Sequence, residues 1–142
     1  MGNNFAVKCA NCGYQRDLLT GIGMAYVGDR LIDPINGTLA HLIKSKVERE
    51  KIFSLLNSGG DLGMYGHRVL ICQACGEFQD GFYYEIIHSG GKLISKHRCK
   101  KCRRVIVPKD DVWFSADLSK FKCPQCGEHS LIEDDSTQTW WD

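Results

Sequence analysis

Cys9-Ala10-Asn11-Cys12 is the first of four copies of one short motif, and these copies decide how the chain can fold. All eight cysteines of the sequence lie in the motif, two in each copy. Two residues between a pair of cysteines allow one tight turn to direct both sulfurs at the same cation. The sequence therefore predicts two tetrahedral metal sites, each with four cysteine ligands. The candidate ligands are Cys9, Cys12, Cys72, Cys75, Cys99, Cys102, Cys123 and Cys126.

The residue after the second cysteine is a glycine in three of the motifs, namely Gly13, Gly76 and Gly127. A turn of this kind tends to need a positive φ at that position, which glycine adopts without steric cost. The third motif differs, because Arg103 follows Cys102. We expect that turn either to have another shape or to be mildly strained.

Each motif supplies half of a site, so the motifs must pair. The third and fourth motifs are separated by 20 residues, a spacing typical of zinc sites, which leaves the first and second to pair across 59 residues. We prefer this sequential pairing, and the entropy of closing the longer loop is no strong objection to it. Two alternatives stay open. One joins the second motif to the third across 23 residues and the first to the fourth, and the other is a cross-braced arrangement.

Zinc is the commonest occupant of closed four-cysteine sites, so the expected cofactor is Zn²⁺, one ion per site. A thioredoxin-like redox site would have one CxxC pair beside a βαβ unit, a pattern that this sequence lacks. Structural disulfides would need an oxidising compartment, but Met1-Gly2-Asn3-Asn4 has neither the basic start nor the apolar stretch of a secretory signal. We therefore expect a cytoplasmic protein with reduced thiols.

The composition is that of an ordinary globular protein, with 142 residues, of which 43% are hydrophobic and 25% charged. This length fits one domain or two small ones. No apolar run is long enough to suggest contact with a membrane interior. Eight thiolates and two divalent ions would shift the formal net charge from +1 to about −3. The totals therefore do not suggest a generally basic nucleic-acid-binding protein.

Apolar residues at helical spacing predict one amphipathic helix over about 39–57. It should end at Ser58-Gly59-Gly60, and the glycine-rich run up to Gly66 is expected to be a turn or a mobile loop. Short stretches of high β-propensity predict strands, with a hairpin turn at Ser89-Gly90-Gly91. The expected strands cover residues 5–8, 14–19, 67–71, 82–87, 92–98, 104–107 and 130–133.

Motifs of the form CxxCG flanked by short strands resemble those of the zinc-ribbon superfamily. The resemblance covers the motifs and the adjacent strands, and it implies structural zinc held by the eight cysteines without implying a particular activity. The fold class that we expect is therefore a small, metal-stabilised α+β protein, in which two zinc ribbons of short antiparallel strands carry one inserted amphipathic helix. The expected parts are a first ribbon with the helical insertion at 1–88, a second ribbon at 89–135, and an acidic, tryptophan-containing tail at 136–142.

A second resemblance concerns the metal. The runs from Cys9 to Tyr14 and from Cys123 to Gly127 look like the two knuckles of rubredoxin, which would imply an iron electron carrier. Two further motifs lie between these runs, and zinc is the commoner occupant, so iron is the alternative rather than the preferred metal.

One stretch of the chain is strongly basic, with seven positive residues and no acidic one. These candidate nucleic-acid-binding residues are Lys92, Lys96, Arg98, Lys100, Lys101, Arg103 and Arg104. They could contact phosphates while Tyr83, Tyr84 or Trp113 stacks on unpaired bases. In the interpretation that we favour, the same cations offset the negative charge of a metal-thiolate site. The tail ends in Trp140 and Trp141, which either pack back on the domain or contact a protein partner.

Enzymatic function is not favoured. Catalytic zinc sites keep one coordination position open, whereas thiolates fill both predicted sites. The sequence has no HExxH motif, and it misses the zinc deaminase signature because Pro124 lies inside its motif, after Cys123. The sequence thus predicts a non-enzymatic binding module for a nucleic acid or a protein assembly. The alternatives are a rubredoxin-like electron carrier and an accessory subunit of an enzyme.

Overall fold

Most of the chain belongs to one antiparallel sheet. The computed structural model describes residues 2–23, 32, 37, 39–108, 117–137 and 139–141. Seven of the described strands form a sheet with the order β5-β4-β3-β2-β1-β8, in which β9 also pairs with β1. These strands are β1 (Gly2–Cys9), β2 (Gln15–Gly21), β3 (Asp61–Ile71), β4 (Phe78–His88), β5 (Gly91–Ile94), β8 (Leu131–Glu133) and β9 (Trp140–Trp141). A second sheet contains β6 (His97–Arg98) and β7 (Val105–Ile106).

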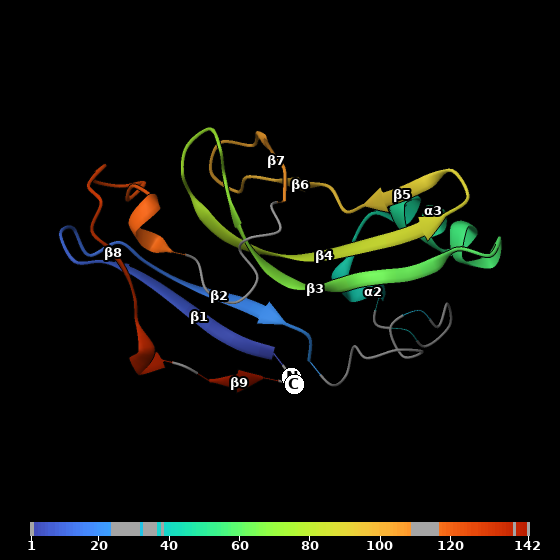
Figure 1. Ribbon diagram of the computed structural model, residues 1–142, viewed down its shortest axis with the longest axis horizontal. Helices are drawn as coiled ribbons and strands as arrows, with labels where there is room; N and C mark the ends of the chain where they lie inside the picture. Colours follow the sequence, from blue (N-terminus) through green and yellow to red (C-terminus); the bar gives the residue numbers. More distant parts are fainter. Residues whose placement is uncertain are drawn as a thin grey trace.

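The large sheet is built from two hairpins, which Figure 1 shows as the blue strands on the left and the long green and yellow strands that extend to the right. In the first hairpin, β1 pairs with β2 from Gly2↔Gly21 to Lys8↔Gln15. In the second, β3 pairs with β4 over most of its length. The two hairpins are joined where β2 pairs with β3, with Gly21 opposite His67. The two halves of the sheet therefore meet at a narrow junction.

The hairpin predicted through residues 89–91 is confirmed, because β4 pairs with β5 and His88 lies opposite Gly91. The expected strand at 92–98 is nevertheless two strands. β5 ends at Ile94, and β6 pairs with β7 in the small sheet, where His97 lies opposite Ile106. The chain thus leaves the large sheet just before the third cysteine motif.

The prediction of one continuous helix is wrong, because two helices occupy the segment: α2 (Leu39–Leu42) and α3 (Lys46–Asn57). Ser45 separates them as the N-cap of α3, with extended backbone and a hydroxyl that accepts a hydrogen bond from the Glu48 N–H at 3.3 Å. A serine side chain that satisfies a free N–H of the first turn favours a helix start over a helix interior. Periodicity alone did not reveal this start.

The two helices cover one face of the second hairpin, as Figure 1 shows behind β4 and β5. Their apolar side chains form a cluster with alternate residues of β4, since successive side chains of a strand point to opposite faces. The buried members are Leu39, Ile43, Ile52, Phe82, Tyr84 and Ile86. Among the described residues, no helix combines the length and the apolar character needed to cross a bilayer.

The glycine-rich run up to Gly66 was expected to be a turn or loop, and this expectation is wrong. Residues from Asp61 onward extend β3, and Leu62 pairs with Ile86. The register shifts between Leu62 and Tyr65, which marks an irregularity of the bulge type. Gly66 has φ of 144° and approaches the backbone oxygen of Gly21, which a Cβ would meet at 3.0 Å. Glycine is therefore used here for close strand approach rather than for a turn.

The C-terminal tail packs back on the first strand, so both chain ends lie together at the lower edge of Figure 1. Trp141 lies opposite Gly2 in the β1–β9 register, and its indole N–H donates to the Asn3 carbonyl at 3.2 Å. The Trp141 ring also meets the His67 ring edge-on at 5.2 Å between centroids. The neighbouring Trp140 side chain is 72% exposed.

Candidate metal centres

The eight cysteines gather into two groups of four. The outer group joins the first and fourth motifs and consists of Cys9, Cys12, Cys123 and Cys126. The inner group joins the second and third motifs and consists of Cys72, Cys75, Cys99 and Cys102. Within each group all four Sγ atoms lie within 4.8 Å of one another. Both groups are therefore close enough to hold one metal ion each.

The preferred sequential pairing of the motifs is wrong, and the first of the two alternatives describes the molecule. The reason is the sheet: β8 pairs with β1 so that Leu131 lies opposite Cys9, which brings the fourth motif to the first. The second motif follows β3, and the third lies between the paired strands β6 and β7. Each group takes two ligands from residues 1–88 and two from 89–135, so neither predicted ribbon segment holds a complete site.

The distances between the sulfurs fit a tetrahedral ion. In the outer group Cys9 Sγ lies 3.7 Å from Cys126 Sγ, and Cys12 Sγ lies 3.5 Å from Cys123 Sγ. The corresponding distances in the inner group are 3.5 Å and 3.6 Å. Four sulfurs at about 2.3 Å from a central zinc would be about 3.8 Å apart, whereas disulfide sulfurs would be about 2.05 Å apart. The thiols are free, and the spacing suits a shared cation.

The four turns have the same backbone structure. In the inner group the Cys72 N–H donates to the Glu77 carbonyl at 3.0 Å, and the Cys99 N–H donates to the Arg104 carbonyl at 2.8 Å. The glycines after three of the motifs have positive φ, for example 75° at Gly76. Arg103 has the same conformation, with φ of 66°. The expectation of mild strain at the third motif is thus supported, because a side chain occupies a left-handed position that favours glycine.

Hydrogen bonds to sulfur favour the thiolate form of Cys9 in the outer group. Cys9 is buried, and the Ser130 hydroxyl lies 3.0 Å from its Sγ, within reach to donate. The Asn11 N–H also donates to this sulfur at 3.4 Å. The Ser130 hydroxyl makes the largest contribution and lowers the pKa of the Cys9 thiol to about 6. The N–H groups of Asn11 and Cys12 act in the same direction, and burial opposes them.

In the inner group the two cysteines of one motif differ. Burial acts to raise the pKa of Cys72, but the N–H groups of Cys75 and Ala74 outweigh it and lower the pKa to about 6. Burial and the neighbouring sulfurs raise the pKa of Cys75 to about 12. Four thiolates at these distances repel one another, and a divalent cation among them removes that penalty. The donor set is therefore suited to a metal, with no coordination position left over for a substrate.

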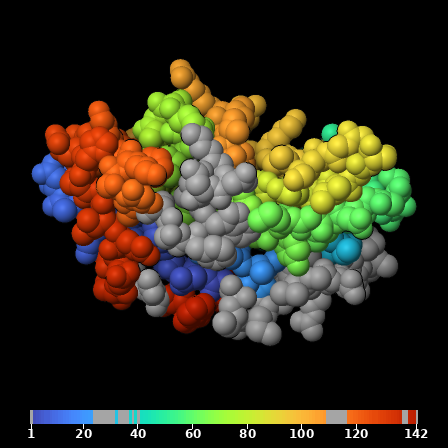
Figure 2. Space-filling view, in the orientation of Figure 1, coloured from blue at the N-terminus to red at the C-terminus, as the bar shows by residue number. Residues whose placement is uncertain are grey.

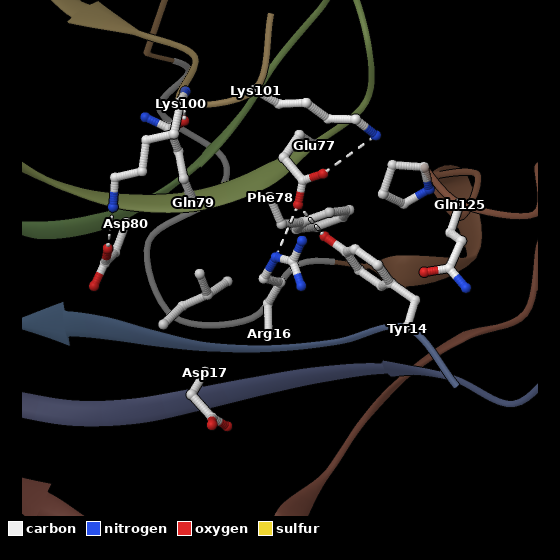
Figure 3. Close-up of a pocket in the computed structure, with 12 residues that line it drawn as sticks. Tyr14, Arg16, Asp17, Glu77, Phe78, Gln79, Asp80, Lys100, Lys101 and Gln125 are labelled. Atoms are coloured by element: carbon white, nitrogen blue, oxygen red, sulfur yellow. Dashed lines mark hydrogen bonds and ion pairs between the residues drawn. The ribbon is translucent and has the colours of Figure 1, made fainter. Parts of the chain in front are cut away.

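A buried carboxylate connects the two groups. Glu77 directly follows the turn of the inner group, and it accepts hydrogen bonds from the Tyr14 hydroxyl at 2.6 Å and from Arg16 Nε at 2.9 Å. Tyr14 directly follows the turn of the outer group. Lys101, inside the third motif, places its Nζ 3.7 Å from the other Glu77 oxygen. Figure 3 shows these three side chains converging on the carboxylate.

This contact lies beside a cavity of about 650 Å³ that the turns of both groups border. Burial, together with the hydrogen bond to Glu77, raises the pKa of the Tyr14 hydroxyl, so the proton stays on the tyrosine. Tyr14, Arg16 and Glu77 were not among the residues predicted for the site. The signal was their position, since Tyr14 and Glu77 both come directly after a CxxCG motif.

Three residues of the basic stretch are engaged in ion pairs. Lys92 lies 3.1 Å from Glu85, and Lys100 lies 3.6 Å from Asp80. Lys101 pairs with Glu77 as described above. Arg98 donates to the Arg103 carbonyl at 3.3 Å, and the side chains of Lys96, Arg103 and Arg104 are exposed. Lys100 and Lys101 border the cavity between the metal groups, whereas Lys92 and Lys96 border a different groove.

Two of the three aromatic residues that were candidates for base stacking are buried. Tyr83 and Tyr84 are each 3% exposed. The Tyr83 ring lies under the Arg68 guanidinium, 3.5 Å from ring centroid to Cζ, and the Tyr84 hydroxyl donates to Glu48 of α3. Neither ring presents a face to solvent, so their expected role in base stacking is wrong. Trp113 lies outside the described residues.

Comparison with known proteins adds no relative: no protein-family model, curated protein or solved structure matches this chain.

Proposed function

We propose that each four-cysteine group holds one structural zinc ion, and that the protein is a non-enzymatic binding module built on these two centres. The observation that carries this proposal is the sulfur geometry: in each group all four Sγ atoms lie within 4.8 Å of one another, and two Sγ–Sγ distances are 3.5 to 3.7 Å. Four thiolates complete a tetrahedral shell, so a bound ion has no open position for water or substrate. The bound ion would therefore contribute its binding free energy to the stability of the fold.

The test of the metal is elemental analysis of freshly purified, reduced protein. We expect about two equivalents of zinc per chain. The alternative is iron in the outer group, because its two motifs are the runs that resemble rubredoxin. That result would give a red protein with thiolate-to-iron absorption bands and would replace the zinc proposal. Less than about one equivalent of any metal would remove the proposal of two structural centres altogether.

Of the two classes of partner, we favour a protein over a nucleic acid. Three cations of the basic stretch are already paired with carboxylates, namely Lys92, Lys100 and Lys101. Base stacking would need exposed rings, and Tyr83 and Tyr84 are buried. Exposed apolar side chains, in contrast, suit contact with a protein.

The test of the partner class uses metal-loaded protein. We expect single-stranded and double-stranded RNA and DNA to bind weakly or not at all when titrated at two salt concentrations. Tight binding that weakens steeply with salt would support a nucleic-acid module instead. Trp140 stays a proposed second contact for a protein partner, and removal of residues 140–142 with retained partner binding would exclude it.

A further inference from the structure

A second cavity, of about 690 Å³, lies between the edge strand β5 and strand β7 of the small sheet, and none of the eight cysteines lines it. We call it the β5–β7 groove. Its apolar walls are formed by Met64, Ile94, Val105 and Val107. In Figure 2 the yellow surface of β5 and the orange surface of the small sheet lie on the two sides of a notch at the upper edge of the molecule. Residues from four separate segments of the chain thus meet around one depression.

The four wall residues are unusually exposed for apolar side chains. Met64 is 51% exposed, Ile94 42%, Val105 57% and Val107 64%. Single exposed apolar residues are common on protein surfaces, but several around one groove mark an interaction site more often than chance would. The groove lies on the face of β4 that carries Tyr83 and Glu85, whereas α2 and α3 cover the opposite face. Among the described residues, no helix covers this face of the sheet.

The charge around the groove is positive. Glu85 is the one acidic residue among the described residues that line it, and it is buried and paired with Lys92 at 3.1 Å. The Tyr83 hydroxyl also donates to Glu85. Lys96 adds an exposed cation to the lining, and the buried Arg68 guanidinium adds a positive charge where it stacks on the Tyr83 ring. An occupant with carboxylates near its apolar side chains would complement this charge.

The charge also argues against a second copy of the chain as the occupant. A two-fold contact would place the same patch on both sides of the interface, and Lys92 and Lys96 would face their own copies. Like charges brought together at an interface cost free energy. A nucleic acid would complement the charge, but the walls offer aliphatic side chains and the Tyr83 ring is buried.

We propose that the β5–β7 groove binds a segment of a partner protein in which apolar side chains stand next to aspartate or glutamate. This inference rests on the proposed function as a protein-binding module. The apolar side chains of the partner pack between Ile94 and the two valines of the opposite wall. Its carboxylate reaches the Lys96 ammonium.

The test uses the full, metal-loaded chain as bait for a phage-displayed library of random peptides of about 12 residues. Selected peptides are synthesised, and their affinity is measured by fluorescence anisotropy for the native protein and three variants. Val105→Asp places a carboxylate in the apolar wall, and Lys96→Glu reverses a charge of the lining. Val47→Asp is the matched control, because Val47 is 76% exposed on α3, on the helical side of the sheet. Metal content and melting of each variant establish that it is folded.

We expect the selected peptides to be rich in apolar and acidic residues. Val105→Asp should weaken their binding by about tenfold or more, Lys96→Glu by a few-fold, and Val47→Asp should leave it unchanged. A peptide with its acidic residues changed to lysine should bind the native protein poorly and the Lys96→Glu variant better. If Val105→Asp fails to fold, Ile94→Asp tests the same wall from the β5 side.

Several results would overturn the proposal. Selected peptides that bind Val105→Asp and Ile94→Asp as tightly as the native protein would place the binding surface elsewhere, so the groove would fail while the binding-module function stood. Basic peptides would contradict the charge argument. Self-association in sedimentation velocity that Val105→Asp abolishes would identify a second copy as the occupant. No peptide selected at all, together with no copurifying protein, would remove both the groove and the proposed protein-binding function.

Discussion

The outer and inner groups have the same arrangement of sulfurs, but the chain reaches them in different ways. Cys12 and Cys123 of the outer group are 111 positions apart in the sequence, whereas Cys75 and Cys99 of the inner group are 24 apart. The outer group is built into the large sheet through the β1–β8 pairing, and the inner group borders the two-residue strands of the small sheet. The same chemistry thus serves long-range closure in one place and a local hairpin in the other.

The entropic cost of loop closure differs little between the two groups. Closing a loop of 111 residues instead of one of 24 costs only about 1.4 kcal/mol more. Packing separates them further: Cys9 and Cys123 belong to a large cluster with β1 and β2 side chains, and Cys72 and Cys99 to a small one with Leu70 and Ile106. We therefore expect loss of the outer metal to destabilise more of the protein than loss of the inner metal, because more side chains pack around the outer group.

The largest expected effect comes from removing one ligand of each group. Cys9→Ser should release the outer metal and destroy the cooperative unfolding of the whole chain, because structural zinc contributes about 10–16 kcal/mol of apparent binding free energy. Cys99→Ser should release the inner metal while the β1–β2 hairpin stays folded. Metal content and thermal unfolding, followed by circular dichroism, measure both. Equal loss of structure in the two variants, or unchanged cooperative melting with a chelator present, would contradict this comparison.

Glu77→Gln should weaken the link between the groups. The amide keeps the shape of the side chain but removes the charge that Arg16 and Lys101 face, and hydrogen bonds to charged groups are worth about 1.5–3 kcal/mol. We expect a loss at the lower end of this range, because both cations are about half exposed.

The matched control for this variant is Glu50→Gln, which breaks the exposed Lys46–Glu50 pair of α3. It should change the free energy of unfolding by less than about 0.5 kcal/mol. Both values come from denaturant titrations of metal-loaded protein. An equal effect of the two substitutions would mean that Glu77 does not couple the groups.

Substitutions in the two turns of the inner group should have smaller effects on stability, and of opposite sign. Arg103 and Gly76 occupy equivalent positions with φ of 66° and 75°, whereas both turns of the outer group end in glycine. Arg103→Gly should stabilise the inner group by up to about 1 kcal/mol, since it relieves a left-handed side-chain position. Gly76→Ala should destabilise it by about 1 kcal/mol. Chelator concentrations at half-release of the inner metal rank the variants, and a destabilising Arg103→Gly would show that the turn carries no strain.

The smallest expected effect is a pH dependence at the junction of the two sheet halves. Burial lowers the pKa of His67 below its ordinary value of 6.5, with Asp80 opposing the shift. The folded state therefore binds this proton less readily than the unfolded state. As the pH falls below about 6.5, the unfolded state takes up this proton before the folded state does. The free energy of unfolding is therefore highest above that pH and decreases as the pH falls toward the folded pKa.

His67→Gln should remove this dependence while leaving the stability at higher pH largely unchanged. The measurement is the free energy of unfolding of both proteins between about pH 8 and about pH 5, with metal content determined at each pH because acid also protonates thiolate ligands. Parallel curves for the two proteins would show that His67 does not titrate differently on folding.

Much of the local structure was readable from the sequence. The cysteine pairs, the positive φ of the three motif glycines and the turn between β4 and β5 depend on contacts within a few residues. The break at Ser45 is also local, but serine is compatible with both a helix surface and an N-cap, so spacing did not distinguish them. The strand at Asp61–Gly66 was missed because its stability comes from β4, a partner outside the local sequence.

The sequence by itself determined that the eight cysteines act as four pairs, because CxxC spacing directs two sulfurs to one point whatever the rest of the chain does. Only the tertiary structure decided which pairs meet, because all arrangements cost nearly the same loop entropy and the β1–β8 register selects one of them. The same holds for Glu77. Its partners Tyr14 and Arg16 precede it in the sequence by about 60 residues and Lys101 follows it, so only the fold brings them together. Pairing between distant strands is a property of packing, which no short pattern in a sequence contains.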